Sequence, residues 1–303
     1  MSGFPDSVVA TLQFGIEMLR SLDPGEFVQG TIFTCALSES YPSAAALGML
    51  ITARCDTAQN KAEVYNYIPI VPVEAWIEKD GLELVARRAL ASELGSMKKA
   101  LADAAMSHSI LDFVEHDVIL AELRKGPSKQ EKSVAKRFEQ AAKAVHAANS
   151  MLEKSDRTLP EALAFIDNNE GLYKSIIKEL MTNNLAEFHY LEKSDIGEET
   201  RGYVVIMREI RFISAALGKR IAVGIDAEEF KSLGEVFLPS LNHIRFSAEN
   251  DFAMPLSCVS SPFIELIMQR FANLFSRIGV ADISKERITD AHSWVKAMKG
   301  QSE

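Results

Sequence analysis

The chain has few of the features that identify a membrane, secreted or disulfide-linked protein. Its 303 residues contain no apolar run near the roughly 20 residues that span a bilayer, and no basic region precedes an apolar one at the amino terminus. The three cysteines, Cys35, Cys55 and Cys258, are odd in number and far apart. This spacing disfavours both a disulfide framework and a zinc site completed by His243. These absences predict a cytoplasmic protein without membrane contact or a metal site.

The common catalytic and nucleotide-binding motifs are also missing. The sequence contains no GxxxxGK(S/T), no GxGxxG after a strand, and no HExxH, GxSxG or CxxC. We therefore expect no cofactor. Whether the protein is an enzyme stays open, because nothing supports nucleotide-dependent or common hydrolase chemistry directly.

Charge is unevenly distributed along the chain. The net charge of −9 disfavours nonspecific binding to nucleic acid by the protein as a whole. Residues 124–157, however, hold nine Lys and Arg residues against four acidic ones. The candidates for contact with a partner or an anion in this segment are Lys129, Lys132, Lys136 and Arg137. A solvated helical face is the favoured explanation of these residues. A single aromatic residue, Phe138, is too few for base stacking, so nucleic acid is not the favoured partner.

The order of expected elements is β-rich, α-rich, β-rich and then α. We expect strands at 27–37, 47–54, 64–71, 186–191 and 203–214, and helices at 7–22, 82–106, 110–123, 128–152, 159–167, 172–181, 228–235, 262–278 and 284–298. Pro69 and Pro72 predict that the third strand is an edge strand or ends early.

This order predicts an α+β fold with a small, mostly antiparallel β core assembled from both ends of the chain. Three regions follow: 1–80 with an N-terminal helix and the first part of the β core, 81–184 as a large helical insertion, and 185–303 with the second part of the core and C-terminal helices.

Cys55 and Asp56 form the most prominent candidate site, where an apolar run gives way to a polar turn. Functional groups often lie where a rigid element ends. A thiol nucleophile needs nearby cations and a histidine base, and Arg54 is adjacent, although in a strand its side chain points to the opposite face from Cys55. The alternative is a small core thiol followed by a capping carboxylate.

Two other groups of charged residues interrupt apolar segments. Arg208, Glu209 and Arg211 lie within the predicted strand 203–214, where an ion pair or a solvated sheet face is the simplest interpretation. Arg270 and Arg277 are seven residues apart on the predicted helix 262–278, so they share a face that could bind a phosphate or a partner's carboxylate, or simply be solvated. His189, inside the strand 186–191, is expected to be partly buried and hydrogen-bonded.

Two resemblances accompany these elements. The segments VQGTIFTCAL, LITARCD and IPIVPV, over about 45 residues, resemble the layout of PemK/MazF-type SH3-like barrels. That family cleaves RNA with an arginine on the early strands and a threonine or serine nearby, and Arg54 and Thr57 are the nearest equivalents. The order of a strand ending in Cys-Asp, FHYL, VVIMREIRFIS and a closing SPFIELIMQRFANLFSRIG helix is similar to that of uncharacterised bacterial proteins.

These observations predict a cytoplasmic, bacterial binding or regulatory protein that acts through a protein partner, with a β core of SH3-like barrel type. The first alternative is an enzyme that cleaves phosphodiesters with the region around Cys55 and Asp56. The second is a structural subunit of a homo-oligomer, because the long insertion helices could bury a face against a copy of themselves.

Overall fold

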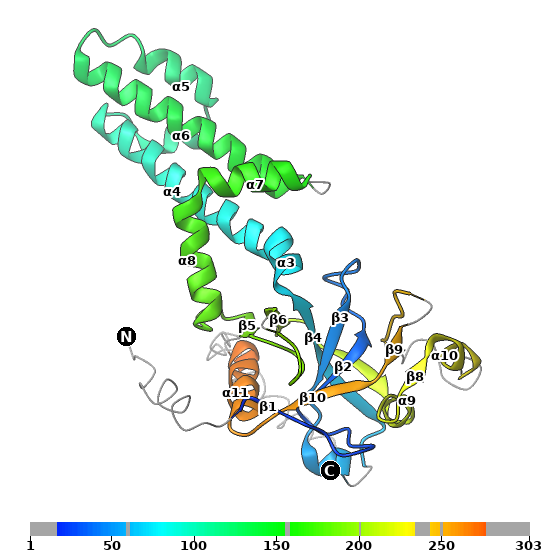
Figure 1. Cartoon of the computed structure of the whole chain (residues 1–303). Helices are drawn as coiled ribbons and strands as arrows, with labels where there is room; N and C mark the ends of the chain where they lie inside the picture. The colour runs from blue at the N-terminus through cyan, green and yellow to red at the C-terminus, as the bar shows by residue number, and fades with distance from the viewer. Residues whose placement is uncertain are drawn as a thin grey trace, which may run out of the picture.

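A curled antiparallel sheet with a projecting helical arm makes up the computed structural model, which describes residues 17–58, 61–154, 158–199, 201–233, 243–248 and 251–276 (Figure 1). The fold is α+β, and the sheet forms a half-barrel. Four predicted helices fall wholly or partly outside these residues: all of 284–298, the last two residues of 228–235, the last two of 262–278, and most of 7–22. The end of the last of these is described and is a strand, so the prediction is wrong there.

Eight described strands form the half-barrel sheet in the order β1-β10-β2-β3-β4-β6-β5, with β7 also paired to β4. All its pairings are antiparallel. The strands are β1 (Leu19–Arg20), β2 (Thr31–Ala36), β3 (Ala46–Leu50), β4 (Val64–Pro72), β5 (Phe188–Leu191), β6 (Tyr203–Ile206), β7 (Arg211–Ser214) and β10 (Pro255–Val259). A separate pair joins β8 (Ile225–Asp226) to β9 (Phe252–Ala253). The prediction that both ends of the chain build one β core is confirmed.

The strand β4 has neighbours on both sides, so the prediction that it is an edge strand is wrong. One side pairs with β3, while the other side is shared by β7 at positions 64–67 and by β6 at positions 70–72. Pro69 lies in the gap between these two partners. A residue without an N–H group is tolerated there because neither β6 nor β7 pairs with that position.

Apolar side chains are buried on both faces of the sheet, which explains the nearly continuous hydrophobic runs of its strands. Ile32 and Met49 pack with Ile267 of α11 (Phe263–Ser276) on one face. Phe33 and Leu50, the next residues along β2 and β3, pack on the other face with α9 (Ala215–Ile221). Close approach of β3 to β2 requires Gly48, because a Cβ there would lie 2.5 Å from the Phe33 ring. Two short helices complete this part: α2 (Arg54–Ala58) and α10 (Ala227–Leu233).

The helical arm begins directly after β4. Three helical segments follow one another without a break: α3 (Val73–Trp76), the π-helical turn η2 (Ile77–Gly81) and α4 (Leu82–Asp103). The remaining segments are the 3₁₀ turn η3 (His108–Asp112), α5 (His116–Leu123), α6 (Lys129–Glu153), α7 (Leu159–Asn168) and α8 (Glu170–Met181). The predicted insertion is thus helical as expected, but its first helix starts earlier than 82 because α3 and η2 precede it.

The far end of the arm has a hydrophobic core of its own. Met97, Leu101, Ile119, Val134 and Phe138 are buried there between α4, α5 and α6. The start of α6 is fixed by a capping box, in which the side chains of Ser128 and Glu131 bind each other's backbone N–H groups. The arm projects away from the sheet in Figure 1, and this cluster gives its far end packing that is separate from the sheet.

A search of the described helices for one long and apolar enough to cross a membrane finds none.

Candidate functional site

The corner at Cys55 and Asp56 lies on the one-turn helix α2, not at the end of a strand. β3 ends at Leu50, and residues 51–53 separate it from α2. The Sγ atom of the exposed Cys55 is 3.6 Å from Oδ1 of Asp56. Nowhere in the described ranges does a histidine form a hydrogen bond or ring contact with Cys55. The arrangement supplies an accessible thiol without the base that a cysteine nucleophile needs.

Arg54 connects α2 to the start of α11, so the prediction that a strand holds it on the face opposite to Cys55 is wrong. Its Nη2 lies 3.5 Å from Oγ of Ser261 and 3.9 Å from a carboxylate oxygen of Glu265. Ser261 donates to Glu265 at 2.6 Å, and this bond lowers the pKa of the Glu265 carboxyl. The Thr57 hydroxyl donates to backbone carbonyls of residues 53 and 54, which closes the α2 turn.

Arg270 is occupied by contacts within the fold. From α11 its Nη2 donates to the carbonyls of Leu185 and Phe188 at 2.8 and 3.0 Å, and its Nη1 lies 2.8 Å from Nδ1 of His189. Burial lowers the pKa of Arg270. These contacts are made along the edge of the sheet at β5. They occupy the guanidinium, which is therefore not available to bind an anion. Arg277, its predicted companion, lies outside the described residues.

His189 is buried and hydrogen-bonded, as expected from its place in a strand. Burial and then the nearby charge of Arg270 lower the pKa of His189 to about 3. The imidazole is therefore neutral at physiological pH, and its Nδ1 accepts from the guanidinium. A group with this pKa is poorly matched to general acid–base work near neutral pH.

A buried carboxylate at the base of the arm is a feature that the sequence reading missed. Asp80, in the π-helical turn η2, accepts from the hydroxyl of Tyr41 and from Nη2 of Arg208, which lies 2.8 Å from both carboxylate oxygens. Burial, followed by the charge of Asp80, raises the pKa of Tyr41. Arg208 also pairs with Glu187 at 2.9 Å. The cluster ties the arm to two connections of the sheet, the loop between β2 and β3 and the turn between β6 and β7.

The other two charged residues of this segment fix a neighbouring loop. The apolar run 203–214 is two strands, β6 and β7, and the turn between them carries Arg208 and Glu209. The Glu209 carboxylate accepts from Oγ of Ser38 at 2.9 Å and from the backbone N–H groups of Glu39 and Ser40 at 2.7 and 3.1 Å. Arg211 pairs with Glu39 at 2.6 Å. Of the two interpretations, the ion pair applies to Arg208 and Arg211, although a turn rather than one continuous strand carries Arg208 and Glu209. Since charges rarely interrupt buried apolar runs without partners, this break was the signal that could have indicated the cluster.

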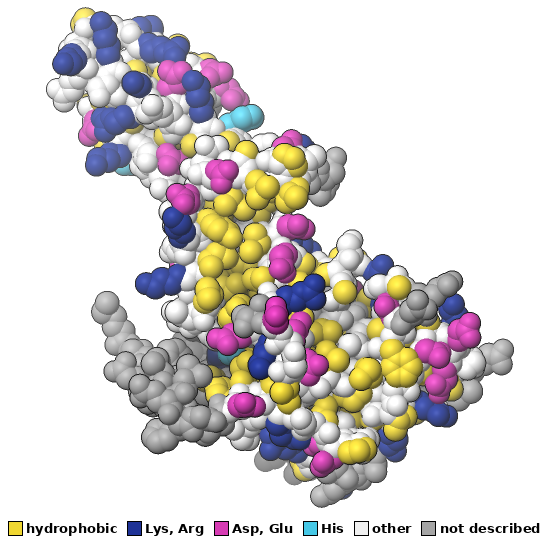
Figure 2. Space-filling model, in the orientation of Figure 1, with side chains coloured by type: hydrophobic (Ala, Val, Ile, Leu, Met, Phe, Trp, Pro, Cys, Tyr) yellow, Lys and Arg dark blue, Asp and Glu magenta, His cyan; other side chains and the backbone are white. Residues whose placement is uncertain are grey.

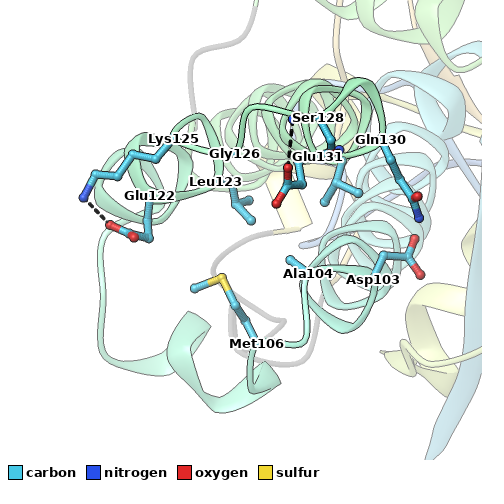
Figure 3. A pocket seen from close by; sticks show the side chains of 11 residues that line it. Asp103, Ala104, Met106, Glu122, Leu123, Lys125, Gly126, Ser128, Gln130 and Glu131 are labelled. Atoms are coloured by element: carbon cyan, nitrogen blue, oxygen red, sulfur yellow. Dashed lines mark hydrogen bonds and ion pairs between the residues drawn. The ribbon is translucent and has the colours of Figure 1, made fainter.

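The tip of the arm is a second candidate site, because it contains a cavity with both apolar and charged side chains. A cavity of about 890 Å³ opens between the end of α4, α5 and the start of α6. Figure 3 shows Met106 and Leu123 pointing into it from opposite sides, while Lys125 points away and pairs with Glu122. Val134 completes the apolar floor. The cavity can accept an apolar side chain, and a polar rim surrounds it.

Three of the four predicted basic residues remain open at this tip. Lys129, Lys132 and Lys136 follow the spacing of one helical face and are exposed. Over the described ranges their side chains form no hydrogen bond or ion pair, whereas Arg137 pairs with Asp103 at 2.8 Å. Figure 2 shows Lys and Arg side chains gathered over the tip.

The tip also exposes two large apolar side chains. Phe113, after η3, is 86% exposed, and Val118 of α5 is 60% exposed. Exposed apolar residues at the same end of the arm as a basic face are typical of a contact surface, because an aromatic anchor and complementary charge together favour association. Sequence periodicity could not reveal Phe113, because it lies in a turn.

A scan against protein-family models finds no match, and searches of curated proteins and of solved structures find no significant match. Within the ranges that the structure describes, no three His, Cys, Asp or Glu side chains group so as to hold a metal ion.

Proposed function

We propose that this chain is a binding or regulatory protein that acts through a protein partner, and that the tip of the helical arm contacts this partner. The observation that carries the proposal is the combination of an exposed Phe113, a cavity with an apolar floor and an open basic face on an arm with its own core. An acidic protein surface with an apolar side chain to insert fits these features.

The basic face favours an acidic protein over nucleic acid as the partner. Acidic side chains, Glu122 and Glu131, line the cavity at the same tip, so the surface is of mixed charge. A surface for a phosphate backbone is usually broadly positive, and the chain carries a net charge of −9. The apolar anchor and cavity have no role in backbone recognition.

The SH3-like barrel type of the β core remains part of this proposal. Its support is the curled antiparallel sheet, with β4 shared by β3, β6 and β7. The half-barrel leaves β1 and β5 as its end strands over the described residues.

Site-specific crosslinking tests the proposal. A photoreactive p-benzoylphenylalanine replaces Phe113 in the full chain in its own cells, and a second strain carries it at the exposed Val223, in the turn between α9 and β8. The expected result is a discrete protein adduct from position 113 alone, which survives nuclease treatment.

Charge reversal adds the matched control. Lys129→Glu, Lys132→Glu and Lys136→Glu together should abolish the adduct. The same reversal at three exposed lysines on the body, Lys61, Lys219 and Lys231, should leave it unchanged. An adduct that is nuclease-sensitive, equally strong from Val223 or indifferent to the tip reversal contradicts the proposal, and an adduct at twice the chain mass supports the homo-oligomer instead.

A further inference from the structure

Two chain segments join the helical arm to the sheet, and a single side chain contacts both of them. The outgoing segment runs from β4 through α3 and η2, and the returning segment, residues 182–187, leads from α8 to β5 (Figure 1). Arg208, in the turn between β6 and β7, donates through Nη2 to Asp80 on the outgoing segment at 2.8 Å. Its Nη1 donates to Glu187 on the returning segment at 2.9 Å. These two contacts, which we call the Arg208 bridge, hold both segments to the sheet.

The bridge acts on an irregular part of the helical run. In the π-helical turn η2, the N–H group of Leu82 donates to the carbonyl of Ile77, five residues back. Such turns inside longer helices are frequent at functional sites, and helices change direction at them. The run from α3 to α4 can therefore bend at η2 more easily than along α4.

Open space lies beside this turn on two sides. A cavity of about 820 Å³ separates the loop 40–44 from α3, η2 and α7, and another of about 380 Å³ lies between the start of α4 and residues 185–188. Glu83, the second residue of α4, lines both cavities. Because protein interiors are otherwise close-packed, rotation of a helix normally meets neighbouring atoms at once. Here a small rotation of the arm toward the loop 40–44 meets empty space.

The other contacts at the base of the arm allow such a rotation. The fully buried Trp76 of α3 packs edge-on against Phe188, and its Nε1 has no hydrogen-bond partner among the described residues. Apolar contacts are non-directional and tolerate small sliding movements, whereas hydrogen bonds require a narrow geometry. Tyr41 and Lys79 connect η2 to the loop 40–44 on the side of the larger cavity, so these contacts remain when the Arg208 bridge opens.

From these contacts we infer that the Arg208 bridge sets the direction of the arm, and that its opening lets the arm rotate about η2 toward the loop 40–44. The arm then has two positions, bridged and rotated. A partner that binds the rotated arm more tightly would open the bridge, because a ligand shifts a conformational equilibrium by its differential affinity for the two states. The motion itself requires no partner, so it does not depend on the tip contact proposed above.

Distances between two spin labels, measured by double electron–electron resonance on the full chain, test this inference. One label is attached to the exposed Cys55 beside the sheet and the other to α4 through Lys99→Cys, in a background whose other two cysteines are replaced by alanine. The intact bridge should give one narrow distribution of distances. Arg208→Met should shift or broaden this distribution by several ångströms. Adding Ala75→Phe, which places a ring in the larger cavity, should narrow it again.

Two controls separate rotation of the arm from its unfolding. Arg88→Met removes a bidentate pair with Glu179 inside the arm, and the Arg88 side chain is 34% exposed against 31% for Arg208. This change should leave the distribution as it is. A second label pair within the arm, at Lys99→Cys and His146→Cys with Cys55 replaced by serine, should stay narrow in Arg208→Met. Unchanged distances in Arg208→Met, an equal change in Arg88→Met, a broadened distribution within the arm, or no effect of Ala75→Phe overturns the inference.

Discussion

The link between Asp80 and Arg208 should couple the stability of the arm to that of the sheet. Asp80 is only 6% exposed, so its carboxylate depends on partners within the fold. Removing one partner of a buried ion pair costs about 3–5 kcal/mol, because it leaves a charge uncompensated. The guanidinium of Arg208 is partly solvated and the Tyr41 hydroxyl remains, so we expect Arg208→Met to lower the free energy of unfolding by about 2–3 kcal/mol.

A double-mutant cycle isolates this interaction. Asp80→Asn keeps an acceptor for the Tyr41 hydroxyl, and combining it with Arg208→Met should restore part of the loss, with a coupling energy of about 2 kcal/mol. The matched control is the pair of Arg137 and Asp103 at the tip, which is of similar length but exposed. Its coupling energy should stay below about 1 kcal/mol.

Urea unfolding provides the measurement. Trp76 is fully buried at the base of the arm and packs against Phe188, so its fluorescence reports on the region of the cluster. The second tryptophan of the chain, Trp294, is replaced by Phe in every variant so that the signal has one source. Circular dichroism follows the helices in parallel. A coupling energy for Asp80 and Arg208 equal to that of the tip pair would refute the reasoning.

Three further predictions concern the sheet and its cysteines. Gly48→Ala should destabilise the fold by about 1–3 kcal/mol in urea unfolding, since its Cβ would meet the Phe33 ring at 2.5 Å; a neutral effect would contradict the close approach. The fold lowers the pKa of His189 from 6.5 to about 3, so on acidification the unfolded chain takes up a proton on this residue before the folded chain does. The free energy of unfolding should therefore fall by roughly 2–3 kcal/mol between pH 6.5 and pH 4.5. This contribution should be absent in His189→Gln. With a thiol reagent at neutral pH, the exposed Cys55 should react much faster than Cys35, which is partly buried and whose pKa burial raises to about 11; equal rates for both would contradict this assignment.

The overall class of the fold was predictable because long periodic segments dominate the chain. The helix at Lys129–Glu153 follows from its apolar stripe and its Ser-x-x-Glu start, and the structure reproduces it within a residue or two. The β core assembled from both ends followed from two separate apolar regions. These patterns lie within single segments of the sequence, so they predict an element without knowledge of its partners in the fold.

Long-range pairing was not predictable from the same signals. β10 was missed because PLSCV is short and has no alternation, yet it pairs with both β1 and β2. Pro69 suggested an edge strand. In the structure β7 and β6 pair with β4 on either side of position 69, so the missing N–H group is tolerated inside the sheet. The break between β6 and β7 depends on partners from residues 38–40 and 80, which no local window contains.

The candidate site residues were likewise predictable where local periodicity decides their exposure, and not where contacts with distant segments decide it. The open lysines at the tip were identified from sequence because exposure on a helical face follows from periodicity. Arg54 and Arg270 were assigned as partner or anion contacts. Backbone carbonyls of a distant segment engage Arg270, whereas Arg54 stays exposed beside Ser261 and Glu265. Asp80 and Phe113 were not predicted, because the burial of Asp80 and the exposure of Phe113 both depend on tertiary packing.

The unbroken passage from β4 through α3 and η2 into α4 makes the arm a lever. At 1.5 Å per residue, the helical run from Val73 to Asp103 extends roughly 45 Å beyond the sheet. A tilt of about 5° at its base would displace the tip by roughly 4 Å. Force applied at the tip would thus act with mechanical advantage on the π-helical turn and on β4, the strand to which three others are hydrogen-bonded.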